Sequence, residues 1–222
     1  MRLLYHLHLS PSCRTVRIAL AEKGLEFTLK TENLWERRPE FLRLNPACEV
    51  PVMVEPDGLV VCGQTPILAF IEESFAERAL LPAPVRERAE ARRLVDWFAA
   101  KFDREVTQNL VGEKIMKRLL KSGEPDTGAI RAGHANIHVH LDYIGWLVER
   151  RNWLAGDAFT LADIAAGAHL SALDYIDEVP WDDHLPAREW YARLKSRPSF
   201  RPILADHVPG VPPPRHYADP DF

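Results

Sequence analysis

Asn45-Pro46-Ala47-Cys48-Glu49-Val50-Pro51 leads directly into two short runs of apolar and β-branched residues, at 50–54 and 59–62. Pro56-Asp57-Gly58 separates the two runs and is typical of a tight turn, so together they predict a β-hairpin. A helix is expected to follow at 65–73, with a proline in its first turn, where a missing N–H costs nothing. This part of the chain therefore predicts strand, strand, helix.

Upstream of the hairpin the chain alternates between strand and helix patterns. Short apolar runs predict strands at 3–7 and 25–30, and the apolar spacing over 13–23 predicts a helix that Gly24 ends. A short helical turn is expected at 41–44. The resulting order, β-α-β-α-β-β-α, is that of a thioredoxin-like domain, which we place at residues 1–77.

The rest of the chain has a helical pattern. A proline-rich linker is expected at 78–84 and an all-helical domain at 85–206, so the fold class is α/β plus all-α. The expected helices are a long one at 85–120, a second that ends near 151, a buried one at 161–175, and a last one at 186–195. The tail at 207–222 contains three consecutive prolines, which favour extended polyproline II structure over helix.

Composition limits the possible classes of protein. The chain has 222 residues, a net charge of -4 and no apolar run near the roughly 20 residues that span a bilayer. A broad basic surface for nucleic acid is therefore not expected, and neither is membrane insertion. Three cysteines, Cys13, Cys48 and Cys62, cannot all pair with one another, so a reducing cytosol is expected.

Three stretches together resemble the glutathione S-transferase superfamily: 10–25, 45–51 and 153–165. The resemblance covers nearly all of residues 1–206 and implies a thioredoxin-like N-terminal domain followed by a helical one. It implies a cis bond between Val50 and Pro51, because cis peptide bonds are almost confined to X-Pro. Thr160 and Asp163 have the spacing of a capping box, which begins a buried helix and carries no catalytic role.

The resemblance also implies a glutathione pocket. Ser10 takes the position of the hydroxyl that supports the glutathione thiolate, and the alternative is an ordinary helix N-cap. The backbone of Val50, exposed by Pro51, would pair with the cysteinyl backbone of glutathione. Gln64 and Thr65 would supply polar contacts at a helix N-terminus. Cys13 is expected to be a structural cysteine.

One departure from the family pattern weakens this pocket. The family has a Glu-Ser pair that holds the γ-glutamyl end of glutathione, and here the pair is Gly63-Gln64. Because no acidic partner remains for the γ-glutamyl ammonium, we expect weak glutathione binding and no firm catalytic residue, Ser10 being at most a vestige. No cofactor is expected, and glutathione enters only if the chain is a working Ser-type transferase.

The tail and segments 109–119 and 142–146 resemble members of this family that act in bacterial cell division as adaptors, bind filaments of the tubulin homologue FtsZ, and couple them to constriction and cell-wall synthesis. Trp35 is a candidate anchor, and its alternative is packing on a sheet edge. The remaining candidates for partner binding are Glu113, Lys114 and Arg118 on the long helix, whose first interpretation is solvent-facing charge, and Tyr217, Asp219, Asp221 and Phe222 in the tail.

The tail is expected to dock a partner and to be dispensable for folding; alternatively, Tyr217 and Phe222 pin it to the helical domain. The resemblance also predicts a two-fold homodimer with the helix that begins near Val85 in its interface. His134 and His138 lie one helical turn apart, but a third ligand is not in view, and no metal site is expected.

Overall fold

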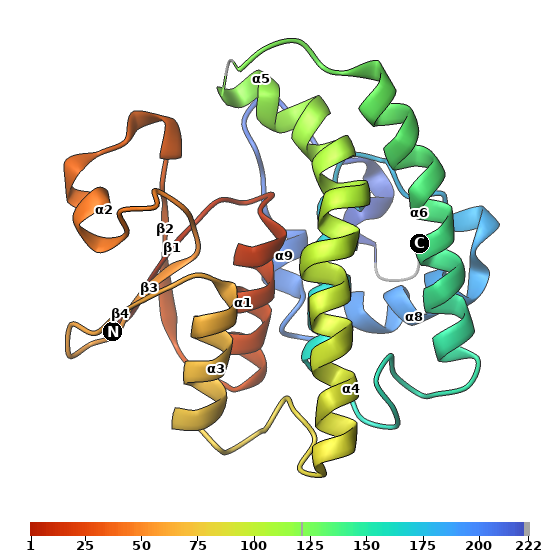
Figure 1. Cartoon of the computed structure of the whole chain (residues 1–222), viewed down its shortest axis with the longest axis horizontal. Helices are drawn as coiled ribbons and strands as arrows, with labels where there is room; N and C mark the ends of the chain where they lie inside the picture. Colours follow the sequence, from red (N-terminus) through yellow and green to blue (C-terminus); the bar gives the residue numbers. More distant parts are fainter. Residues whose placement is uncertain (121, 220–222) are drawn as a thin grey trace. The chain divides into compact units, whose positions relative to one another are not determined.

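The computed structural model describes residues 1–120 and 122–219. The chain forms two compact units, Met1–Leu80 and the part from Leu81 onward (Figure 1). Asp221 and Phe222, two of the expected partner-binding residues, lie outside the described residues.

The N-terminal unit has the expected β-α-β-α-β-β-α order. Its elements are β1 (Arg2–His6), α1 (Pro11–Glu22), β2 (Phe27–Thr31), η1 (Leu34–Glu36), α2 (Pro39–Leu44), β3 (Val52–Val54), β4 (Val60–Cys62) and α3 (Gln64–Ser74). The sheet order is β2-β1-β3-β4. Strand β2 runs parallel to β1, whereas β3 and β4 are antiparallel to their neighbours, as the predicted hairpin requires.

Alternation along the strands separates the two faces of this sheet. Tyr5 and Val52 belong to a buried cluster that includes Phe41 of α2, with the Tyr5 and Phe41 rings 5.4 Å apart. The residues adjacent to these two in their strands are Leu4, which precedes Tyr5, and Met53, which follows Val52. Both are fully buried, on the opposite face of the sheet. Helices α1 and α3 lie side by side on that face (Figure 1), so both faces of the sheet are covered.

The second unit is helical, as expected. Its elements are α4 (Val85–Asp96), η2 (Trp97–Met116), α5 (Lys117–Leu120), α6 (Thr127–Val148), α7 (Leu161–Asp174), η3 (Trp181–Asp183), α8 (Leu185–Lys195), α9 (Arg201–Leu204) and η4 (Arg215–Ala218). The long helix predicted over 85–120 consists of α4, η2 and α5 in direct succession. Its middle segment, η2, has the i→i+5 hydrogen bonding of a π-helix, which apolar spacing does not reveal.

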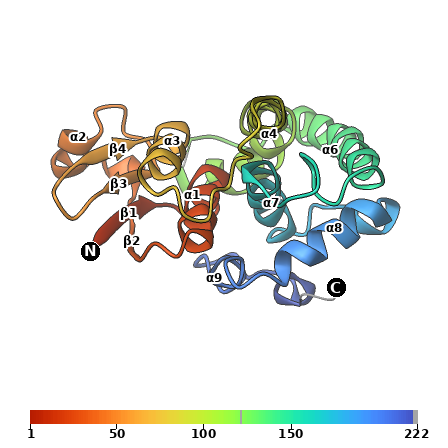
Figure 2. The same ribbon diagram turned by 90° about the horizontal axis from the view of Figure 1, so that it is seen from below.

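Helix α7 is the core of the helical unit, because every one of its residues is buried. It lies among α4, α6 and α8 (Figure 2). The predicted capping box begins it: the Thr160 side chain accepts a hydrogen bond from the helix backbone, and the Asp163 carboxylate accepts one from the Thr160 N–H at 3.0 Å. Such reciprocal bonds satisfy donors that a helix end leaves unpaired.

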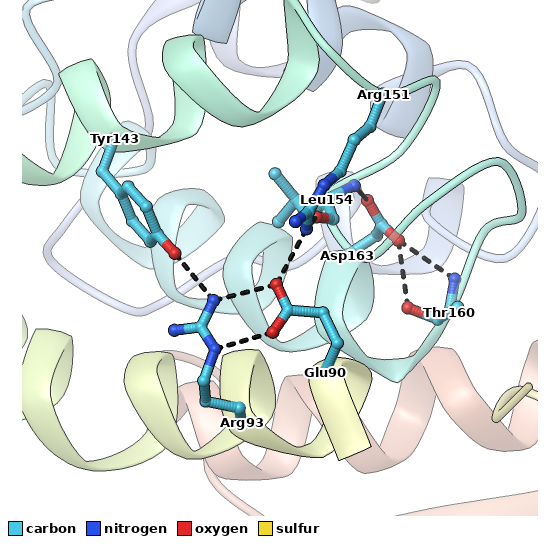
Figure 3. A network of polar contacts seen from close by, with 7 residues as sticks. All are labelled: Glu90, Arg93, Tyr143, Arg151, Leu154, Thr160 and Asp163. Carbon is cyan, nitrogen blue, oxygen red and sulfur yellow. Dashed lines mark hydrogen bonds and ion pairs between the residues drawn. The ribbon is translucent and has the colours of Figure 1, made fainter. Parts of the chain in front are cut away.

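A polar network joins α4 to α6 and to the loop before α7 (Figure 3). Glu90 accepts two hydrogen bonds from Arg93 and one of 2.8 Å from Arg151, and these cations hold the pKa of Glu90 down at about 2. Arg93 also donates to the hydroxyl of Tyr143 at 2.7 Å, and Arg151 donates to the Leu154 carbonyl at 2.8 Å. The network thereby fixes Tyr143 on α6.

The expectation that the tail lies outside the core and contains no helix is wrong for 208–219. Tyr175 accepts a hydrogen bond from the Val208 N–H and donates one to the Val211 carbonyl, each 2.8 Å long. Residues 215–218 form the 3₁₀ helix η4, and Tyr217 is completely buried. The prolines favour extended backbone only at their own positions, so a helix can begin directly after them. The ring of Tyr217 then has apolar area whose burial stabilises the packed tail.

Among the described residues, no helix is both long enough and apolar enough to cross a membrane.

Candidate functional site

The predicted pocket residues converge on one edge of the N-terminal sheet. Tyr5 pairs with Val52, so Pro51, which directly precedes β3, lies at the edge of the sheet where β1 ends. Ser10 follows the end of β1 by four residues. Val52 also pairs with Cys62, the last residue of β4, which leads into Gln64. The register therefore brings Ser10, Val50, Pro51, Gln64 and Thr65 to the same edge.

Ser10 lies at the N-terminus of α1. It is the N-cap, and its Oγ accepts a hydrogen bond from the Cys13 N–H at 3.3 Å. Because the side chain is only half-buried, a second hydrogen bond from its hydroxyl to a ligand is compatible with this position. The capping alternative thus holds, and it does not exclude the thiolate-supporting one.

Cys13 is a structural cysteine rather than a nucleophile. Its side chain is completely buried, and burial raises the pKa of the thiol to about 11, against smaller opposing effects from hydrogen bonds to Ser10 and Leu7. Because the thiolate is the reactive form, the thiol at this position is inert at neutral pH.

The bond between Val50 and Pro51 is cis, as predicted. The turn before it is held by Asn45, whose side-chain amide donates to the Glu49 carbonyl at 2.9 Å and accepts from the Ala47 N–H at 3.2 Å. The Pro51 carbonyl accepts from the Gly63 N–H at 2.9 Å and so ties the start of β3 to the start of α3.

Gln64 is the most unusual polar group at this edge. Its side chain is only 8% exposed, and within 1–120 and 122–219 neither its Oε1 nor its Nε2 has a hydrogen-bond partner. A buried amide without partners is uncommon and needs a physical account, of which a polar ligand is one. Thr65, next along the chain, is exposed, and no side chain in the described part of the chain caps α3.

This edge can bind an anionic, peptide-like group. The N-terminus of α3 favours a carboxylate, and the amide of Gln64 offers one donor group and one acceptor. A cationic amine would be bound less strongly at this edge, because Gly63 and Gln64 carry no negative charge to pair with it. Glu49 is exposed on the turn before Val50.

Trp35 lies on η1 and is exposed by 45%. The loop around it is closed by an ion pair between Glu32 and Arg38 and by a hydrogen bond of 2.8 Å from Asn33 to Glu36. These contacts hold the loop in one shape, so the Trp35 ring projects from a structured loop.

The charged residues predicted on the long helix bind partners within their own unit. Glu113 forms an ion pair of 2.6 Å with Lys117 and accepts from the Asp126 N–H at 2.7 Å, which lowers its pKa. Lys114 forms an ion pair with Glu178. Arg118 is exposed on α5. Arg118 is therefore a solvent-facing charge, whereas Lys114 is bound to Glu178 of its own unit.

Sequence reasoning missed Glu178. Its carboxylate binds Lys114 with one oxygen and, at 2.6 Å, the Nε2 of His134 with the other. Glu178 is 64 residues from Lys114, and no local pattern signals the contact. His138 instead lies 2.8 Å from His184, so the two histidines have different partners. Among the described residues, no group of three or more His, Cys, Asp or Glu could hold a metal ion.

In the tail, Tyr217 is enclosed by its own unit, whereas Asp219 is exposed. Lys195 donates to the His216 carbonyl at 2.9 Å, and the ring of His216 lies 3.3 Å from the carboxylate of Asp174. Tyr217 is therefore not accessible to a partner while the tail is in this position.

Comparisons with known proteins agree with this fold. A glutathione S-transferase N-terminal domain model matches residues 9–74. FtsZ-localized protein A of Caulobacter vibrioides is 50% identical over 224 aligned residues, which cover 100% of this chain and 98% of that protein.

Two solved structures are similar throughout. A glutathione S-transferase from Rhodospirillum rubrum has 55% identity and a TM-score of 0.98, with 100% of both chains covered. FzlA from C. crescentus has 50% identity and a TM-score of 0.96, with 100% of this chain and 99% of that one covered. With full-length identity of 50% and the same two-unit architecture, the chain belongs to the glutathione S-transferase superfamily.

Proposed function

We propose that this protein associates with FtsZ filaments at the division site, as a non-enzymatic adaptor rather than as a glutathione transferase. The observation that carries the proposal is its 50% identity, over its whole length, to a protein named for localisation with FtsZ. The pocket agrees with it, since Gly63 and Gln64 leave the γ-glutamyl ammonium of glutathione without an acidic partner.

Trp35 is the anchor that we assign to the filament. A half-exposed tryptophan on a loop closed by the Glu32–Arg38 ion pair loses little conformational freedom on binding. Such rigid aromatic side chains are enriched among the residues that dominate protein interfaces.

Arg118 and the Glu113–Lys114 pair supply charge to the same function. Because Lys114 is already bound to Glu178, it contributes direction and specificity more than new binding energy. FtsZ binding is then coupled to constriction and cell-wall synthesis through the end of the tail, where the exposed Asp219 sets the charge. Asp221 and Phe222, outside the described residues, belong to the same proposed docking segment. A homodimer through α4 would present each of these surfaces twice.

Sedimentation of polymerised FtsZ with the purified full chain tests the proposal. The wild-type protein should pellet with filaments and remain in solution without them, and Trp35→Ala should bind at least about tenfold more weakly. Leu59→Ala is the matched control, because Leu59 is also in the N-terminal unit and is 46% exposed. Absence of wild-type protein from the filament pellet would rule the adaptor function out.

A second candidate, a Ser-type glutathione transferase that conjugates glutathione to small electrophiles, has one observation in its favour. The amide of Gln64 is buried and has no hydrogen-bond partner among the described residues, as expected of a group that binds a polar ligand. Ser10 could still donate a hydrogen bond to a thiolate at the α1 N-terminus. Direct titration with glutathione separates the two candidates.

A further inference from the structure

Helix α6 carries an exposed stripe on the side away from its own unit's core. Its members recur at alternating spacings of three and four residues: Ala132, Ala135, Val139, Asp142 and Trp146. All five are exposed, Val139 by 64% and Trp146 by 49%. This is the spacing of a coiled-coil seam, in which one helix packs lengthwise against another. In Figure 2 α6 lies at the edge of the helical unit.

The large side chain of this stripe is held in place. The Trp146 ring stacks on Tyr143, with centroids 6.2 Å apart and planes 15° apart, and the Arg150 guanidinium lies 4.6 Å from its centroid. Tyr143 in turn accepts the hydrogen bond from Arg93 (Figure 3). An exposed aromatic residue with its orientation fixed loses little entropy when a second surface covers it.

We propose that the α6 stripe binds a second copy of this chain, with the two α6 helices antiparallel and a two-fold axis beside Val139. In that arrangement residues equally distant from Val139 face each other. Trp146 is then opposite Ala132, each seven residues from Val139. The stripe is therefore self-complementary in size: its large end fits against its small end, as a two-fold interface requires.

The charges at the two ends of α6 match in the same way. Glu149 would lie about one helical turn or less from Arg131 of the partner subunit, on the same flank. The symmetry forms this opposite-charge pair twice. A parallel pairing would instead place Trp146 against Trp146 of the partner subunit and like charges together, which is unfavourable.

This inference goes beyond the proposed function and does not depend on it. It also differs from the homodimer expected through α4, because it uses another helix of the same unit. A chain with both contacts would form assemblies larger than a dimer, so the size of the assembly distinguishes one contact from two.

Disulfide cross-linking at the two-fold axis tests the contact. Val139→Cys, in a Cys62→Ser background because Cys13 and Cys48 are buried, places one thiol against its own copy. Mild oxidation should give a covalent dimer on a non-reducing gel, and Arg104→Cys, also exposed on a helix of this unit, is the control. If Val139→Cys forms no more dimer than Arg104→Cys, the proposal is overturned.

A size exchange tests the antiparallel register. Trp146→Ala leaves a gap and Ala132→Trp sets two tryptophans against each other, so each should weaken α6-dependent association about tenfold in sedimentation equilibrium. The double variant exchanges large for small at both places and should restore association. A double variant no better than the two single ones would refute the register and with it the proposal; melting curves confirm that each variant is folded.

Discussion

The hydroxyl of Tyr217 donates a hydrogen bond of 3.1 Å to the carbonyl oxygen of Ile203, and the Tyr217 ring is completely buried. The ring also lies edge-on against Tyr175, with centroids 5.1 Å apart. These contacts make the tail, through Ala218, a packed part of the helical unit. Among the described residues of the tail, Asp219, which follows η4, remains exposed to a partner while the fold is intact.

Tyr217→Ala should therefore destabilise the protein. Removal of a buried aromatic side chain costs about 3–5 kcal/mol in the free energy of unfolding, whereas Tyr217→Phe, which removes the hydroxyl and with it the bond to Ile203, should cost about 1–3 kcal/mol. Urea denaturation of the full chain measures both. Charge reversal at Asp219 is the control, because its exposed side chain should change stability by less than about 0.5 kcal/mol. If Tyr217→Ala and wild type were equally stable, the tail would not stabilise the helical unit, and its role would be docking alone.

The tail shows where sequence reasoning fails. Three consecutive prolines predict local conformation, and they do so correctly as far as the residue before η4. They do not show that Tyr175 has a hydroxyl that binds the backbone of Val208 and Val211, which lie 33 and 36 residues further along the chain. Local signals set local structure, but a distant hydrogen-bond partner requires the tertiary fold.

The glutathione pocket is the second subject for a prediction. Isothermal calorimetry should detect either no binding or a dissociation constant in the millimolar range, since no acid faces the γ-glutamyl ammonium and a lost charged partner costs about 2–5 kcal/mol. Conjugation of a generic electrophile should be correspondingly slow. Micromolar affinity, or rapid conjugation that Ser10→Ala abolishes, would favour the transferase candidate instead.

A gain-of-binding variant makes this prediction sharper. Gln64→Glu places a carboxylate at the N-terminus of α3, one position after Gly63, which aligns with the Glu of the superfamily's Glu-Ser pair, and should improve glutathione affinity about tenfold. Gln64→Leu, which removes both unpaired polar atoms, should instead raise the free energy of unfolding, because a buried amide without partners is destabilising. If both variants match wild type in affinity and stability, then Gln64 has no ligand-related role.

The network at the start of α7 supports a third prediction. Asp163 accepts hydrogen bonds from the Leu154 N–H at 2.9 Å and the Trp190 indole at 3.1 Å, besides those from Thr160, and its side chain is buried. Asp163→Ala would leave these buried donors unpaired, which should cost about 3–5 kcal/mol. Asp157→Ala, on the exposed loop before it, should cost less than about 0.5 kcal/mol in the same denaturation experiment. Comparable losses at the two sites would show that the capping box is not what stabilises α7.

The capping box and the cis-proline turn were both predictable because their signals are a few residues long. Thr160 and Asp163 are three positions apart, and Val50 precedes Pro51 directly. The partner-binding candidates were not predictable to the same degree. Lys114 looks like free surface charge in the sequence, yet its pairing with Glu178 depends on how η2 packs against α7. The exposure of Trp35 likewise depends on a loop that the ion pair between Glu32 and Arg38 closes. These two residues are six positions apart, a separation that matches no regular helical spacing.

The last prediction concerns the pH dependence of stability. His169 is a buried residue of α7, and its Nδ1 lies 2.8 Å from the Thr107 hydroxyl and 3.9 Å from the carboxylate of Asp103. Burial lowers the pKa of its imidazole to about 3. In the unfolded chain the pKa is about 6.5. Below pH 6.5 the unfolded chain therefore binds a proton that the folded chain excludes, so stability falls as the pH falls, by up to about 1.4 kcal/mol per pH unit from this residue.

His169→Gln isolates this effect, because Gln stays neutral and can still accept a hydrogen bond from Thr107. In urea denaturation from pH 7 to pH 4, the free energy of unfolding should fall more steeply for the wild type than for the variant. Between pH 6 and pH 4 the difference between the two slopes should correspond to about one additional proton bound on unfolding of the wild type. His140, whose pKa burial also lowers, acts in the same direction in both proteins and cancels in the comparison. The NMR titration of the His169 ring in the wild-type protein gives a second measurement that needs no variant. Parallel stability curves, together with an imidazole that titrates near pH 6.5, would show that His169 is solvated in the folded protein and would contradict its enclosure in α7.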